Sequence, residues 1–279
     1  MMTANSFQLE DKMYLSVSPW DGLIKGLSVG FTTKNGGNSV EGFSSLNLGL
    51  HVNDQTEIVI KNRDQLAKAL GFSLDNWVFA EQVHSNVIKK VTKESKGKGI
   101  SVYTDGLTAS DGIYTSEKGI MLSLCFADCV PLYFIAPEHS LIGLAHAGWK
   151  GTVKNIAGEM IIKWNKDEGV NLKDIKVAIG PAINDCCYIV DEKVISSIDK
   201  NILKDYPLPY NTVSEGQYKL NLPLLNKYYL FSAGIPDENI ITSDLCTSCE
   251  SGLFFSHRRD KGKTGRMLSF IGINEEAHL

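Results

Sequence analysis

The sequence has no long hydrophobic run, no excess of basic charge and few arginines. Lys and Arg together number 28 against 32 Asp and Glu, which gives a net charge of −4. No basic stripe of the kind found in nucleic-acid-binding proteins stands out. No apolar run reaches the roughly 18 residues that a membrane helix needs. These absences predict a protein with no nucleic-acid partner and no membrane span.

The chain also lacks the signals of several common protein classes. Residues 1–12 have neither the positive stretch nor the apolar stretch of a secretory signal. Six cysteines in 279 residues are too few for a disulfide scaffold. The GxGxxG and GxxxxGK[ST] phosphate-binding patterns are missing. We therefore expect a cytoplasmic protein with reduced thiols, either a monomer or a homodimer, that is neither a dinucleotide-binding nor a P-loop protein.

No repeat, low-complexity tract or Pro/Gly/Ser-rich linker divides the chain, so we expect one domain over residues 1–279 with a core at about 27–272. Hydrophobic periodicity alternates irregularly between strand and helix. This predicts an α/β or α+β fold of layered mixed β-sheets flanked by helices. Strands are expected at 27–33, 77–80, 87–91, 120–126, 132–136, 141–145, 175–179, 239–242, 253–256 and 267–272, and helices at about 54–70, 152–167, 191–203 and 222–233.

Two histidines and one cysteine are the main candidate site: His84 in Glu-Gln-Val-His-Ser, Cys129 in Ala-Asp-Cys-Val-Pro, and His146 in His-Ala-Gly-Trp-Lys. Cys129 and His146 each follow a predicted strand, so their side chains could converge at one edge of a sheet. Two imidazoles and a thiolate suit Zn²⁺, and three protein ligands leave the open position of a catalytic site. The alternative is a hydrogen-bonded core histidine and a plain buried cysteine, but Asp128 beside Cys129 argues against a purely apolar surrounding.

The remaining cysteine patterns are weaker. Cys246 and Cys249 form a single CxxC without a second pair at zinc-ribbon spacing, and we expect a structural or incidental role. Cys186 and Cys187 are adjacent, which is a poor geometry for joint chelation or for a mutual disulfide. We expect these two side chains only to pack.

Arginine is scarce and clustered. Three of the four arginines, Arg258, Arg259 and Arg266, fall within nine positions. Arginine is suited to bidentate recognition of phosphate or carboxylate. The cluster favours an anion site, although a solvated turn is an equal alternative for Arg258 and Arg259.

A larger set of segments resembles the laccase-domain (YfiH-like) family, whose members were first named polyphenol oxidases and are now described as purine nucleoside phosphorylases. The resemblance runs in the correct order from about residue 27 to 272. It rests on Gly36-Gly37, Ser45-Leu-Asn-Leu-Gly, Asn62-Arg63, Gln82-Val-His84-Ser, Asp105-Gly-Leu, Asp111-Gly, Ala127-Asp-Cys129-Val-Pro, His146-Ala-Gly-Trp-Lys-Gly-Thr, Gly180-Pro-Ala-Ile and Thr264-Gly-Arg266.

This resemblance implies a zinc site of His84, Cys129 and His146, and a zinc-dependent purine nucleoside phosphorylase. The implied substrates are phosphate with adenosine, inosine, guanosine or 5′-methylthioadenosine, and the implied side activity is adenosine deamination. The usual zinc-deaminase signature, H-x-E with P-C-x-x-C, is absent, so any deaminase activity would be convergent.

Further roles follow for residues near these motifs. Asp128 is the expected proton shuttle, because it adjoins the ligand Cys129. Lys34, Arg63 and Arg266 are the expected phosphate-binding residues, and Asn47 is expected to bind ribose or base. The family commonly has Arg where this chain has Lys34, and lysine keeps the charge but loses the planar fork.

Three other functions stay open. A copper (Cu²⁺) polyphenol oxidase of the laccase kind needs a histidine-rich trinuclear cluster, and the chain has only six histidines: 51, 84, 139, 146, 257 and 278. A metal-free hydrolase would use Cys129 as nucleophile with His146 or His84 as base. A non-enzymatic protein would bind nucleosides without turnover.

Overall fold

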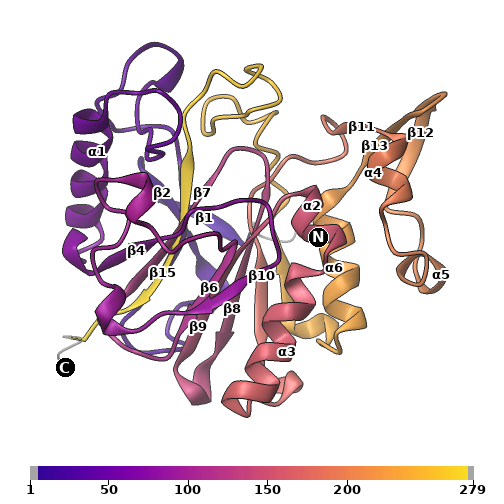
Figure 1. Cartoon of the computed structure of the whole chain (residues 1–279), viewed down its shortest axis with the longest axis horizontal. Helices are drawn as coiled ribbons and strands as arrows, with labels where there is room; N and C mark the ends of the chain where they lie inside the picture. The colour runs from indigo at the N-terminus through magenta and orange to yellow at the C-terminus, as the bar shows by residue number, and fades with distance from the viewer. Residues whose placement is uncertain (1–5, 276–279) are drawn as a thin grey trace.

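Two six-stranded sheets lie face to face in the centre of the molecule, and helices cover their outer faces (Figure 1). The computed structural model describes residues 6–275. The strand order is β1-β2-β3-β15-β7-β4 in the first sheet and β14-β10-β8-β9-β6-β5 in the second. A third sheet, β11-β13-β12, has three strands. Both large sheets mix parallel and antiparallel pairs, so the predicted fold class, an α+β fold of layered mixed sheets, is confirmed.

The bounds of the elements follow in chain order. The strands are β1 Phe7–Asp11, β2 Tyr14–Val17, β3 Leu27–Thr32, β4 Trp77–Phe79, β5 Ile88–Lys90, β6 Gly112–Thr115, β7 Met121–Phe126, β8 Val130–Ala136, β9 Leu141–Ala147, β10 Lys176–Ile179, β11 Ile189–Asp191, β12 Tyr210–Ser214, β13 Gln217–Leu220, β14 Ile240–Thr242 and β15 Met267–Ile273. The helices are α1 Thr56–Ala69, α2 Trp149–Val153, α3 Ile156–Glu168, α4 Glu192–Ser196, α5 Ile202–Asp205 and α6 Leu222–Ser232.

The layers are held by three apolar clusters. The cluster between the two large sheets includes Phe31, Leu124 and Leu144. A second cluster joins the outer face of the second sheet to α3 and α6, and a third joins the outer face of the first sheet to α1. Every residue of β8 and β9 is buried, because both faces of their sheet are covered. That burial explains the continuous apolar sequence of these strands.

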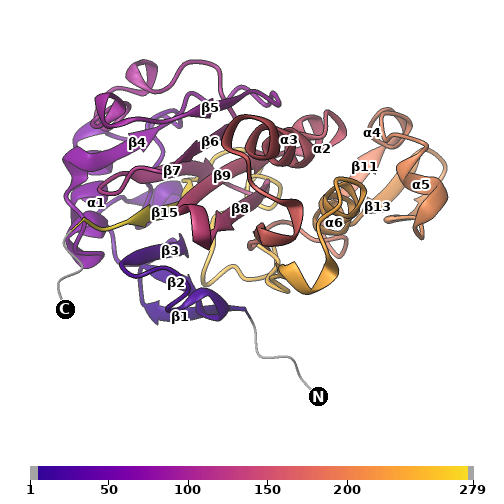
Figure 2. The same cartoon turned by 90° about the horizontal axis from the view of Figure 1, so that it is seen from below.

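Helix α3 shows how local sequence fixes an element. Asn155 caps its first turn by accepting a hydrogen bond from the backbone N–H of Gly158, and Gly169 ends it with a positive φ of 69°. Met160, Ile161 and Trp164 lie at helical spacing and are buried against the second sheet. Figure 2 shows α3 and α6 on one side of the paired sheets and α1 on the other.

Two connections cross from the first sheet to the second at the same end of the molecule. The segment between β4 and β5 makes one crossing, and the turn 127–129 between β7 and β8 makes the other. Because β4 and β7 are parallel, their carboxyl ends lie side by side. Strand β9 runs antiparallel to β8, so its carboxyl end lies beside the start of β8. Three segments that carry candidate ligands therefore meet at one edge.

Some expected elements differ from the structure. Residues 253–256 do not form a strand, although Phe254 is fully buried against Phe31. Their apolar character reflects core filling by a turn rather than sheet pairing. The expected helix at 191–203 is two short helices, α4 and α5, and the hairpin β1–β2 was not predicted. No helix in residues 6–275 is long and apolar enough to cross a membrane.

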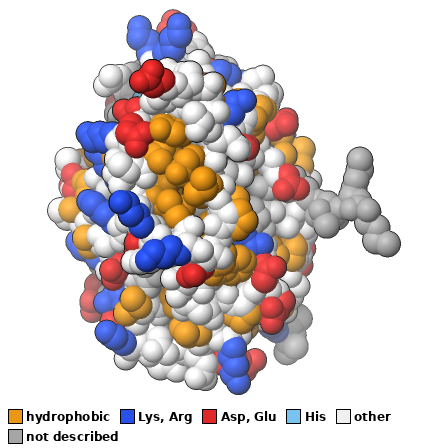
Figure 3. All heavy atoms as spheres, turned by 90° about the vertical axis from the view of Figure 1, so that its right-hand side faces the viewer, with side chains coloured by type: hydrophobic (Ala, Val, Ile, Leu, Met, Phe, Trp, Pro, Cys, Tyr) orange, Lys and Arg blue, Asp and Glu red, His pale blue; other side chains and the backbone are white. Residues whose placement is uncertain are grey.

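The third sheet and its neighbouring helices project from one side of the molecule (Figure 1). Figure 3 looks onto this side and shows hydrophobic side chains exposed among charged ones. Ile189, Leu208 and Val213, in or next to the third sheet, are 41%, 57% and 47% exposed. Strands β11 to β13 belong to this projection, and Tyr188, which leads into β11, lines the cavity of the candidate site.

Candidate metal centre

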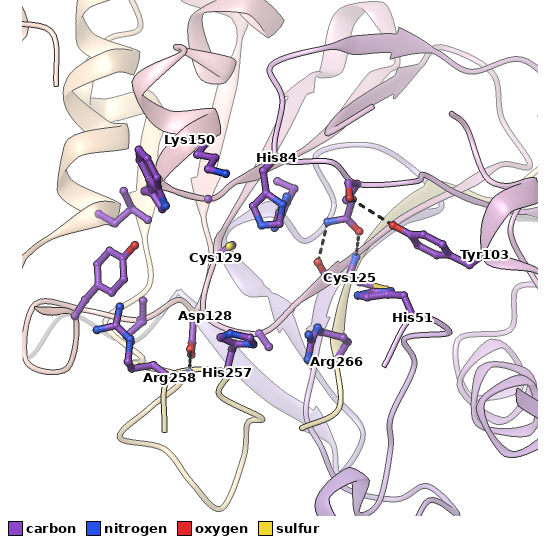
Figure 4. A pocket seen from close by; sticks show the side chains of 18 residues that line it. His51, His84, Tyr103, Cys125, Asp128, Cys129, Lys150, His257, Arg258 and Arg266 are labelled. Carbon is purple, nitrogen blue, oxygen red and sulfur yellow. Dashed lines mark hydrogen bonds between the residues drawn. The ribbon is translucent and has the colours of Figure 1, made fainter. Parts of the chain in front are cut away.

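The three predicted ligands converge. One ligand atom each of His84, Cys129 and His146 lies within 4.8 Å of the others, although the residues come from three different segments. His84 lies in the β4–β5 crossing, Cys129 ends the β7–β8 turn, and His146 lies near the end of β9. His84 is exposed, Cys129 is half-buried and His146 is buried. Figure 4 shows His84 and Cys129 facing the same pocket.

Asp111, to which no role was assigned from the sequence, contacts the ring of His146 and holds the backbone at His84. Its Oδ1 lies 2.9 Å from His146 Nδ1, and its carboxylate accepts hydrogen bonds from the backbone N–H groups of Val83, His84 and Ser85. Burial raises the pKa of Asp111, but its contacts with His146 and Ser85 outweigh burial and lower the pKa to about 2. An ionised carboxylate only accepts, so His146 Nδ1 must carry the proton. Its Nε2 is then left for a metal ion.

The surroundings of the Cys129 thiol favour its ionised form, the thiolate. Burial raises the pKa of Cys129, yet the neighbouring His146 and His84 lower it to about 6. Burial lowers the pKa of His146, but Cys129 and Asp111 raise it to about 9. A thiolate facing two imidazoles is the donor set that Zn²⁺ prefers.

The backbone at Gly148 passes close to two of these ligands. A Cβ atom added at Gly148 would lie 3.0 Å from Cys129 Sγ and 3.0 Å from His84 Cδ2. The glycine in His-Ala-Gly-Trp is therefore required for the close approach of backbone to the ligands. Three converging donors and an oriented imidazole together fit a zinc ion with one open coordination position.

The centre lies in the wall of a cavity of about 490 Å³, a size usual for small-molecule sites. Cationic, aromatic and acidic side chains line it around the three ligands (Figure 4). They include His51, Tyr103, Cys125, Asp128, Trp149, Lys150, Tyr188, His257, Arg258 and Arg266. Burial is the largest of several effects that lower the pKa of His51 to about 4, so its imidazole is neutral at pH 7.

Two arginines, Arg258 and Arg266, line the cavity and have guanidinium N–H groups that are not used in hydrogen bonds to the described part of the chain. Arg258 donates from Nη1 to the carbonyl oxygen of Ile189, and its guanidinium lies 4.9 Å from the ring centre of Tyr188. Arg266 donates from Nη1 to the carbonyl oxygens of Thr264 and Gly265. Among the described residues, hydrogen bonds use only Nη1 of each guanidinium. The other donors of Arg258 and Arg266 are available to an anion.

Two other arginines are used inside the protein. Arg63 is buried and donates to the carbonyl oxygens of Leu48, Gly99 and Ile100, while its guanidinium lies 3.8 Å from the ring centre of Phe79. Arg259 donates to Asp260 and to backbone carbonyls. The expectation that Arg63 binds phosphate is therefore corrected: its donors hold three chain segments together.

Asn47 and Lys34 also lie away from the cavity. Asn47 is fully buried; its amide group accepts from the backbone N–H groups of Gly49 and Arg266 and donates to Asp54. Lys34 lines a separate surface groove. Asn47 thus positions the segment that carries Arg266 instead of lining the cavity, and Lys34 does not line the cavity either.

Asp128 lines the cavity next to Cys129, as its sequence position predicts. Its φ of 86° reflects the tight β7–β8 turn. Oδ1 accepts a hydrogen bond from Thr247 Oγ1 and Oδ2 accepts one from the backbone N–H of Arg258. These bonds fix the orientation of the carboxylate and leave further lone pairs free.

Four of the five remaining cysteines form a second cluster, which was not predicted from the sequence. Sulfur atoms of Cys186, Cys187, Cys246 and Cys249 all lie within 4.8 Å of one another. Cys186 and Cys249 are exposed and Cys187 is half-buried. The expectation that Cys186 and Cys187 only pack was wrong, because a turn brings both sulfurs to the CxxC pair, which therefore does have a second pair.

The sequence matches a known protein family and several known proteins. The family described as "Multi-copper polyphenol oxidoreductase laccase" matches residues 28–274. The chain is 50% identical to "Purine nucleoside phosphorylase YlmD" of Geobacillus stearothermophilus over 97% of its length and 98% of that protein. It is 48% identical to the protein of the same name in Bacillus subtilis, over 99% of its length and 100% of that protein.

The solved structures agree with the sequence relatives. The crystal structure of YlmD from Geobacillus stearothermophilus superimposes with a TM-score of 0.94 at 48% identity, over 98% of this chain and 100% of that one. A family match over most of the chain, close relatives over nearly their whole length and the same fold lead to one conclusion. The protein belongs to the laccase-domain family whose relatives include the YlmD proteins.

Proposed function

We propose that this protein is a zinc-dependent purine nucleoside phosphorylase. Its substrates are adenosine, inosine, guanosine and 5′-methylthioadenosine, which phosphate cleaves to the free base and the ribose 1-phosphate, with deamination of adenosine as a side activity. The observation that carries the proposal is the convergence of His84, Cys129 and His146 within 4.8 Å in the wall of a cavity that two arginines also line. The names of the YlmD relatives support the same activity.

Phosphorolysis needs an anion held beside C1′ of the ribose while the bond from C1′ to the base nitrogen breaks. Phosphate oxygen forms the new bond to C1′, and the electron pair of the broken bond leaves with the base. Arg258 and Arg266, with Lys150 on the same cavity, are the cations available to hold phosphate. Tyr188 and Trp149 offer aromatic faces for the purine.

Proton transfer completes both reactions. The leaving purine must gain a proton, and deamination of adenosine must move protons from water to the departing ammonia. Asp128 is our candidate for this role because Thr247 and the Arg258 backbone hold its carboxylate at the cavity wall. A zinc ion at the three ligands would supply Lewis acidity and a more acidic water. We expect the protein to work in the cytoplasm, where the Cys129 thiol stays reduced.

The test is to incubate the purified protein with adenosine, with and without phosphate, and to identify the products by chromatography. Adenine formed only with phosphate is the expected result, with a smaller amount of inosine in both reactions. If neither adenine nor inosine is formed, the proposal is contradicted. Arg259→Gln is a matched control for Arg258→Gln, because only Arg258 lines the cavity.

One observation favours a metal-free hydrolase as a second candidate. The lowered pKa of Cys129 beside the raised pKa of His146 describes a thiolate–imidazolium pair, which is how cysteine nucleophiles are activated. Treatment with a strong chelator separates the two functions. The hydrolase would keep its activity after all zinc is removed, whereas the phosphorylase would lose it.

The copper oxidase named in the family description is a third candidate. His51 and His257 line the same cavity, but only His84 and His146 belong to the convergent group within residues 6–275. A trinuclear copper cluster needs more imidazoles than this group supplies. Metal analysis of protein purified without added metal, together with an oxygen-uptake assay on phenols, distinguishes copper from zinc.

A further inference from the structure

Four cysteines form a cluster outside the candidate active site. Cys186 Sγ lies 3.5 Å from Cys249 Sγ, and Cys187 Sγ lies 3.4 Å from it. Cys246 completes a group in which all four sulfurs lie within 4.8 Å of one another. A disulfide has an S–S distance of about 2.05 Å, so the four thiols are separate.

The fold itself brings these residues together. Strands β10 and β14 are parallel neighbours, so the loops that follow them leave the sheet at the same edge. Cys186 and Cys187 lie in the loop after β10, and Cys246 and Cys249 lie in the loop after β14. The loops are joined by a bridge between Ala182 and Cys246. The cluster is therefore built into the sheet topology.

The sulfur spacing matches a tetrahedral metal site. Zinc–sulfur bonds of about 2.3 Å at tetrahedral angles place neighbouring sulfurs about 3.8 Å apart, and structural zinc is typically held by four ligands of this kind. Cys246 and Cys249 have the two-residue spacing usual for one half of such a site. The backbone N–H of Asn184 points at Cys246 Sγ from 3.5 Å, as expected for a sulfur that carries negative charge.

We propose that Cys186, Cys187, Cys246 and Cys249 bind a second zinc ion in a closed, structural site. Binding forms four zinc–sulfur bonds and releases the thiol protons to solvent. No position remains for a substrate, so this ion is not catalytic. The proposal concerns metal content and does not depend on the nucleoside reaction.

The position of the site gives the second ion a role. The backbone N–H of Ile183, in the first loop, donates to the carbonyl oxygen of Asp128, and Thr247, in the second loop, donates to the Asp128 carboxylate. Both loops thus meet at the residue before the ligand Cys129. Tyr188, which follows the first cysteine pair, lines the cavity. A zinc ion across the two loops would hold this wall of the cavity in place.

The test is zinc content per chain, measured by elemental mass spectrometry on protein expressed without added metal. We expect two zinc ions in the unaltered chain, one in Cys187→Ser/Cys249→Ser and one in Cys129→Ala. Cys125→Ser, which removes a thiol outside both clusters, should keep two. The Cys129→Ala result separates this proposal from the proposed function, because the second zinc should remain whatever the first site does.

A second measurement keeps the test valid if the double variant fails to fold. Zinc X-ray absorption of the Cys129→Ala protein should show four sulfur neighbours at about 2.3 Å. The proposal would be overturned by the absence of zinc in Cys129→Ala, by iron in place of zinc, or by an intact mass that shows disulfides among the four cysteines. Unchanged zinc content in Cys187→Ser/Cys249→Ser would overturn it as well.

Discussion

Within residues 6–275, two groups of side chains could hold a metal ion, and they differ in number, in chemistry and in surroundings. His84, Cys129 and His146 supply three donors in the wall of a cavity of about 490 Å³. The four cysteines supply only sulfur and join two loops. Three mixed donors leave a coordination position for water or substrate, whereas four sulfurs close the ion off. One end of the second sheet therefore carries both the open group and the group that we propose supports it.

The largest effect that separates the two groups should come from Cys129→Ala. Loss of the thiolate leaves two imidazoles, so we expect loss of the first zinc and a fall in turnover of at least about a thousandfold. The second zinc should remain. Turnover is measured by chromatography of the free base, and zinc by elemental analysis. Wild-type activity in this variant would refute the role of Cys129 in catalysis.

Asp111→Asn tests the support of the open site and should have the next largest effect. The amide can present its N–H to His146 Nδ1 and disturb the proton position, and loss of such a partner typically weakens metal affinity by about 10-fold to 100-fold. Zinc affinity is measured by competition with a chromogenic chelator. We expect added zinc to restore most of the turnover; an unchanged affinity would show that Asp111 does not orient the ligand.

Arg266→Gln should raise the KM for phosphate by about 10-fold to 100-fold, since a hydrogen bond to a charged group contributes about 1.5–3 kcal/mol. Arg63→Gln is its matched control, because that guanidinium is buried and bonded to backbone carbonyls. The control should lower the melting temperature and leave the KM for phosphate unchanged. The KM is measured by steady-state kinetics and the melting temperature by thermal unfolding. If Arg63→Gln raised the KM for phosphate and Arg266→Gln did not, Arg266 would not bind phosphate.

The smallest effect is the pH dependence of stability from Asp111 in metal-free protein. The pKa of Asp111 is about 2 in the folded chain, against 3.8 ordinarily. The carboxylate therefore stabilises the fold fully above about pH 4, and this contribution is lost as the pH falls through 2. The difference in melting temperature between wild type and Asp111→Asn should shrink over that interval. If the difference in melting temperature between wild type and Asp111→Asn grew as the pH fell, the prediction would be contradicted.

The convergence of His84, Cys129 and His146 could be predicted from sequence because each lies in its own short, unusual segment, and Cys129 and His146 lie where predicted strands end. The layers could be predicted too, because β8 and β9 are continuous apolar runs and α3 has helical periodicity with a cap. Short strands with mixed exposure, such as β11 and β12, gave no comparable signal. Phe254 misled the prediction because an apolar side chain can fill a core from a turn.

The parts that escaped prediction depend on contacts between distant segments. Asp111 reaches His146 across 35 positions; Asp111-Gly belongs to the motifs of the family resemblance, but nothing in its local sequence indicates this contact. The four cysteines were judged by spacing along the chain, whereas the parallel pairing of β10 with β14 decides their proximity. Arg63 and Arg266 look alike in sequence, and only burial separates the structural arginine from the one that lines the cavity.

The most direct test of the account is anomalous diffraction at the zinc absorption edge from crystals of the protein purified without added metal. We predict a peak bonded to His84, Cys129 and His146 with one ligand from outside the protein, and a second peak bonded to the four cysteines. Zinc–nitrogen distances of about 2.0–2.1 Å and zinc–sulfur distances of about 2.3 Å are expected. The absence of zinc from the first group, or a fourth protein ligand closing it, would contradict the central claim.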